Sequence, residues 1–307
     1  MADYTTVDQI DPRAIAKDYD LVDPQITPLA GGTANSSFRV SDPTGDYVLT
    51  VLDNHDLPSA RRLAVHTRAL HELGIPTSEV VPASGRELVT TIGTRPMLLK
   101  RWIAGQVKQP FPLPLLPAAG RVLAQLHQLP VGTAGLTDVP TGTRDLSPAQ
   151  RALIPKFTDQ DFATWLTERL DDVRRVERTR PPDPRIIHGD LFDDNIIVGD
   201  DGQLSILDWE TLSIGDSLLD VGMAAVGLAQ ENGLLASERL HAFLAGYSEI
   251  TPISDRDRAA LPSTIIHAAL IIAFHRYYRH NVRFPDPRRN KGHLAMIKFV
   301  ESVDGGF

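Results

Sequence analysis

A cluster of carboxylate, amide and imidazole side chains between residues 186 and 220 is the part of the sequence best suited to chemistry. Its polar members are His188, Asp190, Asn195, Asp208, Asp216 and Asp220. Two apolar runs, residues 195–198 and 204–207, flank an Asp-Gly pair that tolerates the positive φ of a tight hairpin. We therefore predict a hairpin that brings Asn195 near Asp208 at its open end. Two hard oxygen ligands would then lie beside Asp190, an arrangement suited to a divalent metal and a general base.

The order of these side chains also points to phosphoryl transfer. His188, Asp190 and Asn195 have the spacing H-x-D-x-x-x-x-N of kinase catalytic loops. In such loops the Asp accepts the proton of the substrate hydroxyl and the Asn holds Mg²⁺, while a later Asp, here Asp208, supplies the other metal ligand. Asp and Asn are also common in turns, where they cap and solvate the backbone. Several motif residues in the right order favour the catalytic interpretation.

The composition limits the class of protein. The chain has 307 residues, of which 42% are apolar, enough for two lobes with their own cores. The net charge of −8 argues against a nucleic-acid partner, and the lack of cysteine excludes disulfides and cysteine-ligated zinc. The polar N-terminus has no signal run, and the longest apolar stretch, residues 261–274, is too short to span a bilayer. We expect a cytoplasmic protein without a membrane partner; the sequence does not specify its oligomeric state.

The elements that must position the cluster change in type along the chain. Strand-like runs are expected at residues 25–29, 37–40, 47–52, 87–92 and 95–103, with helices at 12–19 and 59–73. A proline-rich stretch, residues 105–117, marks a boundary. Helices are expected beyond it at residues 116–129, 162–176, 217–229, 237–247, 261–278 and 293–302. We predict an α+β, bilobal protein-kinase-like fold, with an antiparallel sheet lobe over residues 1–103 and a mainly helical lobe over residues 104–307.

Two stretches of the first lobe are candidates for contact with a nucleotide between the lobes. Gly31, Gly32 and Asn35 lie in the loop between the first two strands, where glycines let the backbone approach a phosphate. An ordinary hairpin loop is the alternative. Backbone groups from Lys100 to Trp102, where the last strand leads into the hinge, would meet the adenine edge. ATP and Mg²⁺ are therefore the expected cofactors.

The chain resembles a known group of small-molecule kinases, the aminoglycoside phosphotransferase and choline kinase superfamily. The segments that carry the resemblance are HGDLFDDN at 188–195, LDWE at 207–210, GDSLLD at 215–220, LAQLH at 123–127 and the loop LAGGTANSSFRV at 29–40. Within the group it is most similar to the type II homoserine kinase branch. That similarity lies in GTANSSF at 32–38, YVLT at 47–50 and FLAGY at 243–247.

The resemblance implies transfer of the γ-phosphoryl of ATP to a hydroxyl of a small molecule, with homoserine as the expected acceptor. An aminoglycoside, a sugar or a choline-like alcohol is the alternative acceptor. A non-catalytic nucleotide-binding pseudokinase is the alternative of another class. In the implied roles, Asp190 accepts the hydroxyl proton, and Asn195 and Asp208 hold Mg²⁺.

Two further residues are expected to support the catalytic loop. His188 would brace it. Asp220 lies in a nearly continuous apolar helix, where an unpaired carboxylate would be costly, so we expect it to accept hydrogen bonds from backbone N–H groups of that loop. Asp216 is expected to cap the same helix at its N-terminus.

The acceptor is expected in the helical lobe. Arg276 and Arg279, in the segment of residues 275–280, suit a carboxylate such as that of homoserine. Asp193 and its neighbour Asp194 suit an ammonium group. A solvated helix end and a solvated loop are the simpler interpretations of the two segments.

Position 50 departs from most relatives of the superfamily. A lysine in this strand usually grips the α- and β-phosphates and pairs with a glutamate on the next helix. Here the strand has Thr50, and the predicted helix has no acid before Glu72. The cation that replaces the lysine could be Arg39, Arg61 or Arg62, and the sequence does not choose between them.

Overall fold

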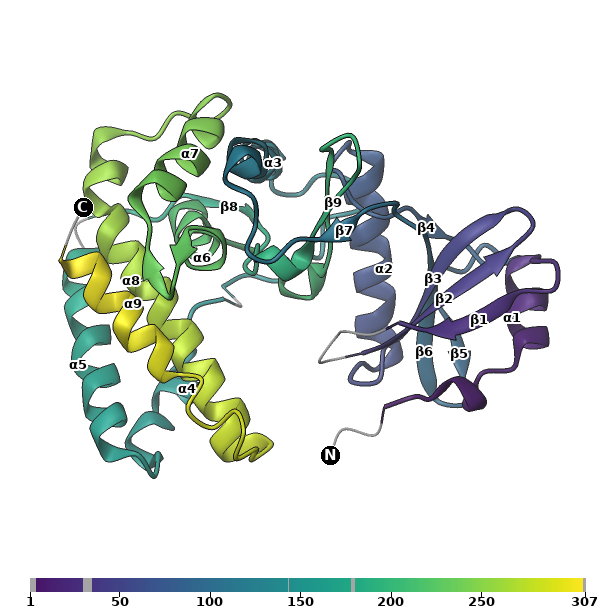
Figure 1. Ribbon diagram of the computed structural model, residues 1–307, viewed down its shortest axis with the longest axis horizontal. Helices are drawn as coiled ribbons and strands as arrows, with labels where there is room; N and C mark the ends of the chain where they lie inside the picture. The colour runs from purple at the N-terminus through teal and green to yellow at the C-terminus, as the bar shows by residue number, and fades with distance from the viewer. Residues whose placement is uncertain (1–3, 30–34, 143, 178–179, 306–307) are drawn as a thin grey trace. The chain divides into compact units, whose positions relative to one another are not determined.

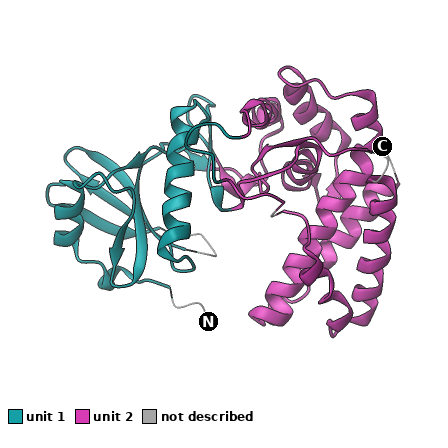
Figure 2. Cartoon of the chain, turned by 180° about the vertical axis from the view of Figure 1, so that it is seen from behind, with its two compact units in different colours: residues 1–106, 132–138, 197–210 teal, residues 107–131, 139–196, 211–307 magenta. Residues whose placement is uncertain are grey.

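The computed structural model describes residues 4–29, 35–142, 144–177 and 180–305. By its internal contacts the chain divides into two compact units (Figure 2). Unit 1 comprises residues 1–106, 132–138 and 197–210, and unit 2 comprises residues 107–131, 139–196 and 211–307. The predicted division into one lobe of residues 1–103 and another of residues 104–307 stays a prediction.

An antiparallel sheet of six strands forms most of unit 1, where five strand-like runs predicted an antiparallel sheet. Its order is β1-β2-β3-β6-β4, with β5 on β6. The strands are β1 (Gln25–Pro28), β2 (Ser36–Asp42), β3 (Gly45–Val51), β4 (Val80–Val81), β5 (Thr90–Ile92) and β6 (Arg95–Arg101). The two-residue strand β4 was not expected, because so short a run has no readable periodicity.

Two helices cover the sheet of unit 1 from either side (Figure 1). Helix α1 (Pro12–Tyr19) packs Ile15 and Tyr19 against Leu49 and Leu99, on one face of the strands. Helix α2 (Leu57–Glu72) packs Ala60 and Ala64 against Leu52 and Leu98, on the other. Because side chains alternate between faces along a strand, Leu98 and Leu99 serve different cores.

A second, three-stranded sheet contains the predicted hairpin. Its order is β10-β9-β7, with β7 (Gln106–Val107), β9 (Ile196–Val198) and β10 (Leu204–Ile206). Strands β9 and β10 are neighbours, which confirms the hairpin expected around the Asp-Gly pair. Gly202 has φ +80°, a conformation in which glycine avoids the steric cost of a side chain.

Unit 2 is mainly helical. Its helices are α3 (Leu116–Gln128), α4 (Pro148–Arg151), α5 (Gln160–Glu177), α6 (Ser217–Leu228), α7 (Ser237–Ser248), α8 (Asp255–Tyr277) and α9 (Leu294–Asp304). Two antiparallel strand pairs complete it: β8 (Pro184–Ile187) with β11 (Ser213–Asp216), and β12 (Gln230–Glu231) with β13 (Leu234–Leu235). Short helical turns η1 (Val7–Gln9), η2 (Leu113–Leu115), η3 (Ile154–Lys156), η4 (Asp193–Asn195), η5 (Trp209–Thr211) and η6 (Tyr278–Arg283) link the elements of the chain.

Helices α3 and α7 lie side by side because glycines let their backbones meet (Figure 1). A Cβ atom at Gly246 would lie 1.9 Å from the carbonyl oxygen of Pro117, and one at Gly120 would lie 2.1 Å from that of Phe243. Any side chain at either position would force the helices apart. The FLAGY segment, residues 243–247, thus has a packing role at its glycine.

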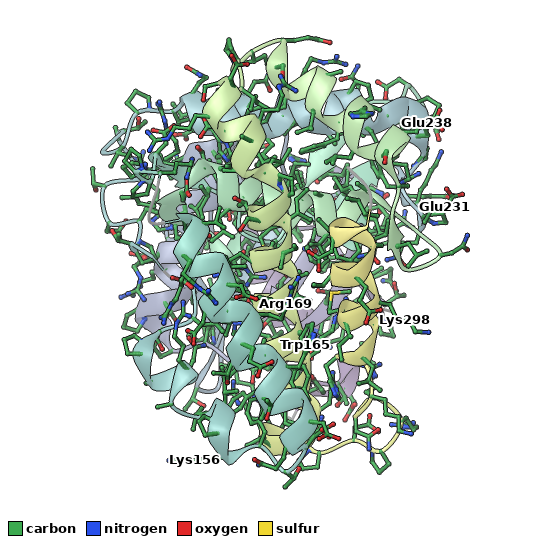
Figure 3. The ribbon with its side chains drawn as sticks, turned by 90° about the vertical axis from the view of Figure 1, so that its left-hand side faces the viewer. Lys156, Trp165, Arg169, Glu231, Glu238 and Lys298 are labelled. Carbon is green, nitrogen blue, oxygen red and sulfur yellow. The ribbon has the colours of Figure 1, made fainter. Side chains whose placement is uncertain are left out.

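Helices α5 and α9 form an outer face of unit 2 (Figure 3). The labelled Trp165 and Arg169 come from α5, and Lys298 comes from α9. Arg169 pairs with Asp304 at 2.5 Å, which joins the two helices.

Helix α8 and the turn after it, Asp255–Arg283, are long and apolar enough to cross a membrane by length and composition alone. The helix begins earlier than the apolar run at residues 261–274 suggested, because Ser254 caps it through the N–H of Asp257. In the fold, 67% of its most apolar window is buried, as expected of a core helix.

Candidate active site

The predicted catalytic loop of unit 2 begins directly after strand β8, which pairs with β11. The backbone N–H groups of His188 and Gly189 donate to the two carboxylate oxygens of Asp220, at 2.8 and 2.7 Å. Gly189 has φ +79°, and this turn of the chain aims both N–H groups at one acceptor. Asp220 therefore holds the loop from helix α6.

The carboxylate of Asp220 is fully buried and keeps its charge through several partners. Burial raises the pKa of Asp220, but the hydrogen bond and charge of His127, the charge of His188 and the Gly189 N–H outweigh it, so the pKa lies below its usual range. His127 Nε2 lies 3.0 Å from Asp220 Oδ2, and His127 Nδ1 lies 2.7 Å from the hydroxyl of Tyr247. Helices α3, α6 and α7 thus all contribute to the support of the loop.

His188, within the loop, makes hydrogen bonds through its ring and its own carbonyl oxygen. The N–H of Asp190 donates to His188 Nδ1 at 3.1 Å, and the hydroxyl of Thr211 donates to the carbonyl oxygen of His188 at 2.6 Å. The imidazole is buried, with 1% of the residue exposed. These contacts suit a bracing role.

Asp190 is partly exposed, and its carboxylate forms an ion pair with Arg144. Arg144 Nη2 donates to Asp190 Oδ1 at 2.9 Å, whereas Arg144 Nε is buried without a hydrogen-bond partner among the described residues. The stem of Arg144 passes Gly189 so closely that a Cβ atom there would lie 3.3 Å from Arg144 Cδ. Arg144 is not among the residues predicted from the sequence, because it lies 46 residues before Asp190 and outside any motif.

The side chain of Asn195 is oriented by the same loop. Its Nδ2 donates to the carbonyl oxygen of Asp190 at 2.9 Å, and its Oδ1 has no hydrogen-bond partner in the described part of the chain. This oxygen is therefore left without a partner from the described residues, and a hard oxygen is the donor that Mg²⁺ prefers.

Asp208 lies in unit 1, at the end of the hairpin. It has φ +59°, and its Oδ1 accepts from the N–H of Glu210 at 3.4 Å. The next residue anchors the turn, because Trp209 Nε1 donates to the hydroxyl of Thr77 at 2.9 Å, and Thr77 donates to the carbonyl oxygen of Ile206 at 2.8 Å. A residue held in the left-handed region for a non-glycine side chain is often found at functional sites.

The predicted metal ligands, an amide oxygen and a carboxylate, suit an ion such as Mg²⁺ that also binds water and phosphate oxygens. Among the residues that the structure describes, no group of three or more His, Cys, Asp or Glu side chains could hold a metal ion. Mg²⁺ typically keeps several waters and binds one or two protein ligands together with substrate phosphates. Asn195 Oδ1 in unit 2 and the Asp208 carboxylate in unit 1 are each an oxygen donor of the type that Mg²⁺ binds, and the metal site that combines them stays a prediction.

Glu210 is a second residue that the sequence analysis did not select. Asn35 Nδ2 donates to Glu210 Oε1 at 2.5 Å, and His55 Nε2 lies 3.4 Å from the same oxygen. Burial raises the pKa of Glu210, but the hydrogen bond and charge of His55, the Asn35 hydrogen bond and the charge of Lys100 outweigh it and lower the pKa. The hydrogen bond to Glu210 in turn raises the pKa of His55. Asn35, Glu210 and Lys100 therefore belong to one polar cluster of unit 1.

The other residues predicted to bind the nucleotide are placed as follows. Gly31 and Gly32 lie outside the described residues. The backbone of Lys100 is paired within the sheet, opposite Val48 and Val80. The N–H of Trp102 donates to the carbonyl oxygen of Asp46 at 3.0 Å. The adenine contact at Lys100 and Trp102 stays a prediction.

Near Asp190, unit 2 brings opposite charges together. Arg276, in the last turn of α8, is half-buried and makes no ion pair with a described residue. Burial lowers its pKa, while the charges of Asp190 and Asp194 act in the opposite direction. Burial and the charges of Asp193 and Asp190 raise the pKa of Asp194.

Two more residues of the predicted acceptor set lie at the edge of this group. Asp193 Oδ1 accepts from Gln109 Nε2 at 2.9 Å. Arg279 is exposed and lies in the turn η6, beyond the end of α8. Burial and the charge of Arg144 lower the pKa of His275 to about 4, so this neighbour of Arg276 is neutral at pH 7.

A family model described as the phosphotransferase enzyme family (APH) matches residues 25–261. The chain belongs to this family. Among curated relatives of this phosphotransferase, a homoserine kinase of Methylobacillus flagellatus is 27% identical over 277 residues, which cover 88% of this chain and 85% of that protein. A homoserine kinase of Pseudomonas aeruginosa (strain LESB58) is 25% identical over 284 residues, 89% of each chain. The predicted enzyme class, a small-molecule kinase, is confirmed.

Solved structures confirm the predicted fold class of the phosphotransferase, a bilobal α+β kinase-like fold. A microcompartment-associated aminopropanol kinase has a TM-score of 0.72 and 19% identity, covering 96% of this chain and 93% of that one. A spectinomycin phosphotransferase in complex with ADP and spectinomycin has a TM-score of 0.70 and 15% identity, covering 96% of each chain.

Proposed function

We propose that the protein transfers the γ-phosphoryl group of MgATP to the hydroxyl of a small hydroxy amino acid, with homoserine as the favoured acceptor. The observation that carries the proposal is the half-buried guanidinium of Arg276, which makes no ion pair with a described residue but is close enough to Asp190 and Asp194 for their charges to act on it. This charge pattern complements a zwitterion. The homoserine kinases of similar sequence support the same acceptor, and a cytoplasmic location goes with it.

Asp190 acts as the base in the proposed reaction. Its carboxylate orients the acceptor hydroxyl and takes the hydroxyl proton as the oxygen attacks the γ-phosphorus. A new oxygen–phosphorus bond forms, and the bond between the γ-phosphorus and the bridging oxygen breaks, so that ADP leaves with the electron pair. Mg²⁺ held by Asn195 and Asp208 would neutralise charge on the phosphates.

Charge decides how the acceptor is held. Three carboxylates crowd together at Asp190, Asp193 and Asp194, and an ammonium group placed among them would relieve their repulsion. The acceptor carboxylate would bind the guanidinium of Arg276, for which a planar carboxylate is the natural bidentate partner. Arg144, bonded to Asp190, adds a second guanidinium to the same group.

A matched set of acceptors tests the proposal. ADP release is measured with homoserine, with 3-aminopropan-1-ol, which lacks the carboxylate, and with 4-hydroxybutyrate, which lacks the ammonium. We expect homoserine to have the highest kcat/KM and each deletion to lower it by roughly 10- to 100-fold, the range for hydrogen bonds to charged groups. A higher kcat/KM for spectinomycin, a sugar or choline would overturn the choice of acceptor, and nucleotide binding without any turnover would favour a pseudokinase.

The role of Asp190 has its own test. Asp190→Asn keeps the shape of the side chain but removes the base, so we expect kcat to fall by about 10²- to 10⁴-fold with the acceptor that the panel selects. Asp201→Asn, in the exposed hairpin turn, is the matched control and should behave like the wild type. Full activity of Asp190→Asn would contradict the assignment.

A further inference from the structure

The sheet register of unit 1 places a lysine on the same face as Thr50. Thr50 in β3 lies opposite Leu98 in β6, and Val48 lies opposite Lys100. Because opposite residues, and residues two apart along a strand, share a face, the side chains of Thr50, Leu98 and Lys100 all emerge on one side of the sheet. Leu98 packs against Ala60 and Ala64 of α2, so this is the α2 side.

Lys100 is therefore the diagonal neighbour of Thr50 on the adjacent strand. Diagonal positions of an antiparallel pair are about 7–8 Å apart, within reach of a long side chain. Thr50 itself is buried, and its Oγ1 has no hydrogen-bond partner among the described residues.

The amine of Lys100 lies within the field of two carboxylates. Burial lowers the pKa of Lys100, and the charges of Asp208 and Glu210 act against that. Lys100 makes no ion pair with any residue in the described ranges, so its charge is not committed to a partner. Asp208 is the predicted metal ligand of this unit, and phosphates bound to that metal would approach the same amine.

The other candidate cations of unit 1 are committed or lie elsewhere. Arg39 Nη2 pairs with Asp46 Oδ2 at 2.8 Å, and its guanidinium lies 4.8 Å from the centre of the Trp102 ring. Arg61 and Arg62 are exposed on α2. None of these three arginines is both free of an ion pair in the described ranges and close to the predicted metal ligand Asp208.

We propose that Lys100 binds the nucleotide phosphates through its side-chain amine, in place of the strand lysine that Thr50 has displaced. The cation has moved from β3 to β6, on the same face of the sheet. Glu210, held by His55 and Asn35, is one of the two carboxylates whose charge acts on the amine of Lys100. The ligand class is a nucleoside di- or triphosphate. This inference rests on the nucleotide part of the proposed function and not on the choice of acceptor.

A relocated lysine tests the inference directly. The dissociation constants of MgADP and of MgAMP-PNP, a non-hydrolysable analogue of MgATP, are measured by calorimetry for the wild type, Lys100→Met, Lys100→Arg, and the double variant Thr50→Lys with Lys100→Met. We expect Lys100→Met to weaken binding by roughly 10- to 100-fold, as for a lost hydrogen bond to a charged group. Lys100→Arg should keep most of the affinity. The double variant should recover at least part of the loss, because it returns a cation to the same face.

Two controls separate binding from folding. Lys17→Met is a matched change at an exposed position of α1 in the same unit, and Arg39→Met removes the competing cation. Both should bind nucleotide like the wild type. If Lys100→Met does not fold, as judged by its thermal transition, the comparison of Lys100→Arg with Lys100→Gln replaces it.

The outcomes are decisive in either direction. Wild-type nucleotide affinity in the neutral variant of Lys100 would overturn the inference. A folded double variant whose affinity does not recover would also overturn it, because a lysine at position 50 emerges on the same face of the sheet and should bind the same phosphates. If nucleotide binding follows the expected pattern but no hydroxyl compound is phosphorylated, Lys100 keeps its role and the proposed function is lost instead.

Discussion

At the scale of single residues, charge placement around Asp190 is the feature that most restricts the substrate. Arg144 already bonds to Asp190, whereas Arg276 has no ion pair within the described parts of the chain. A buried or half-buried guanidinium without a partner costs free energy, so a site that contains one is built for a ligand that supplies the missing charge. The acceptor carboxylate is that ligand in our proposal.

Arg276→Gln tests this assignment. We expect kcat/KM for homoserine to fall by about 10- to 100-fold, mainly through KM, because the acceptor carboxylate loses its charged partner. The same variant should use 3-aminopropan-1-ol as well as the wild type does, since that acceptor has no carboxylate. Arg175→Gln, whose side chain is 73% exposed on α5, is the control. An equal loss with both acceptors would assign Arg276 a structural role.

At the scale of elements, buried polar contacts tie the helices of unit 2 to one another. His267 of α8 is 4% exposed, with its Nδ1 2.6 Å from Glu177 Oε1 and its Nε2 3.4 Å from Asp145 Oδ1. Burial lowers the pKa of His267, but the two carboxylates outweigh it and raise the pKa to about 9. His267 is therefore charged in the fold at neutral pH, and it lines a cavity of about 500 Å³ with Arg144 and Asp145.

The pH dependence of stability should report this histidine. A pKa raised from 6.5 to about 9 on folding contributes stability that is fully present below pH 6.5 and is lost as the pH rises through about 9. His267→Gln should therefore lower Tm most at pH 6, and the difference from the wild type should shrink toward pH 9.5. Thermal unfolding over this range is the measurement, and His241→Gln is the control. A Tm difference independent of pH would mean that the charge of His267 is not involved.

Helix spacing provides a second test at this scale. Gly246→Ala would place a Cβ atom 1.9 Å from the carbonyl oxygen of Pro117, so α3 and α7 must separate. We expect a loss of roughly 1–3 kcal/mol in the free energy of unfolding, the usual cost of overpacking a core. Gly85→Ala, where a Cβ atom would meet nothing within 4 Å, should be near neutral. Urea unfolding measures both, and equal stability of the two variants would contradict the close approach.

At the scale of the whole molecule, the predicted metal ligands come from different units, Asn195 from unit 2 and Asp208 from unit 1. A nucleotide that binds only the native state stabilises it by mass action. At a concentration 100 times its dissociation constant, the free energy of unfolding rises by about 2.7 kcal/mol, and Tm rises with it. We expect MgADP to raise Tm of the wild type, and removal of Mg²⁺ with EDTA to reduce the increase. Asn195→Ala and Asp208→Asn should each reduce it as well, with Asp200→Asn as the control. A full Tm increase in either ligand variant would remove that residue from the metal site.

Sequence patterns were sufficient for the parts of the fold that depend on neighbours along the chain. The strands of the unit 1 sheet other than β4, the helices of unit 2 other than α4, and the hairpin after Asn195 follow from periodicity and turn residues. Their ends were less accurate: α8 begins at Asp255 rather than near residue 261, because its first turn is polar and is set by a cap. The pair β8 and β11 was missed, because each strand is short and forms only with its partner.

By itself the sequence determined that His188, Asp190 and Asn195 share one loop, since they are close in the chain and their spacing alone brings them together. Only the tertiary structure decided which distant side chains join them. Arg144 reaches Asp190 across 46 residues and His127 reaches Asp220 across 93. The face on which Lys100 emerges depends on the register of β3 with β6. Register and helix packing come from the sum of many weak contacts across the fold, and no local pattern of residue types encodes that sum.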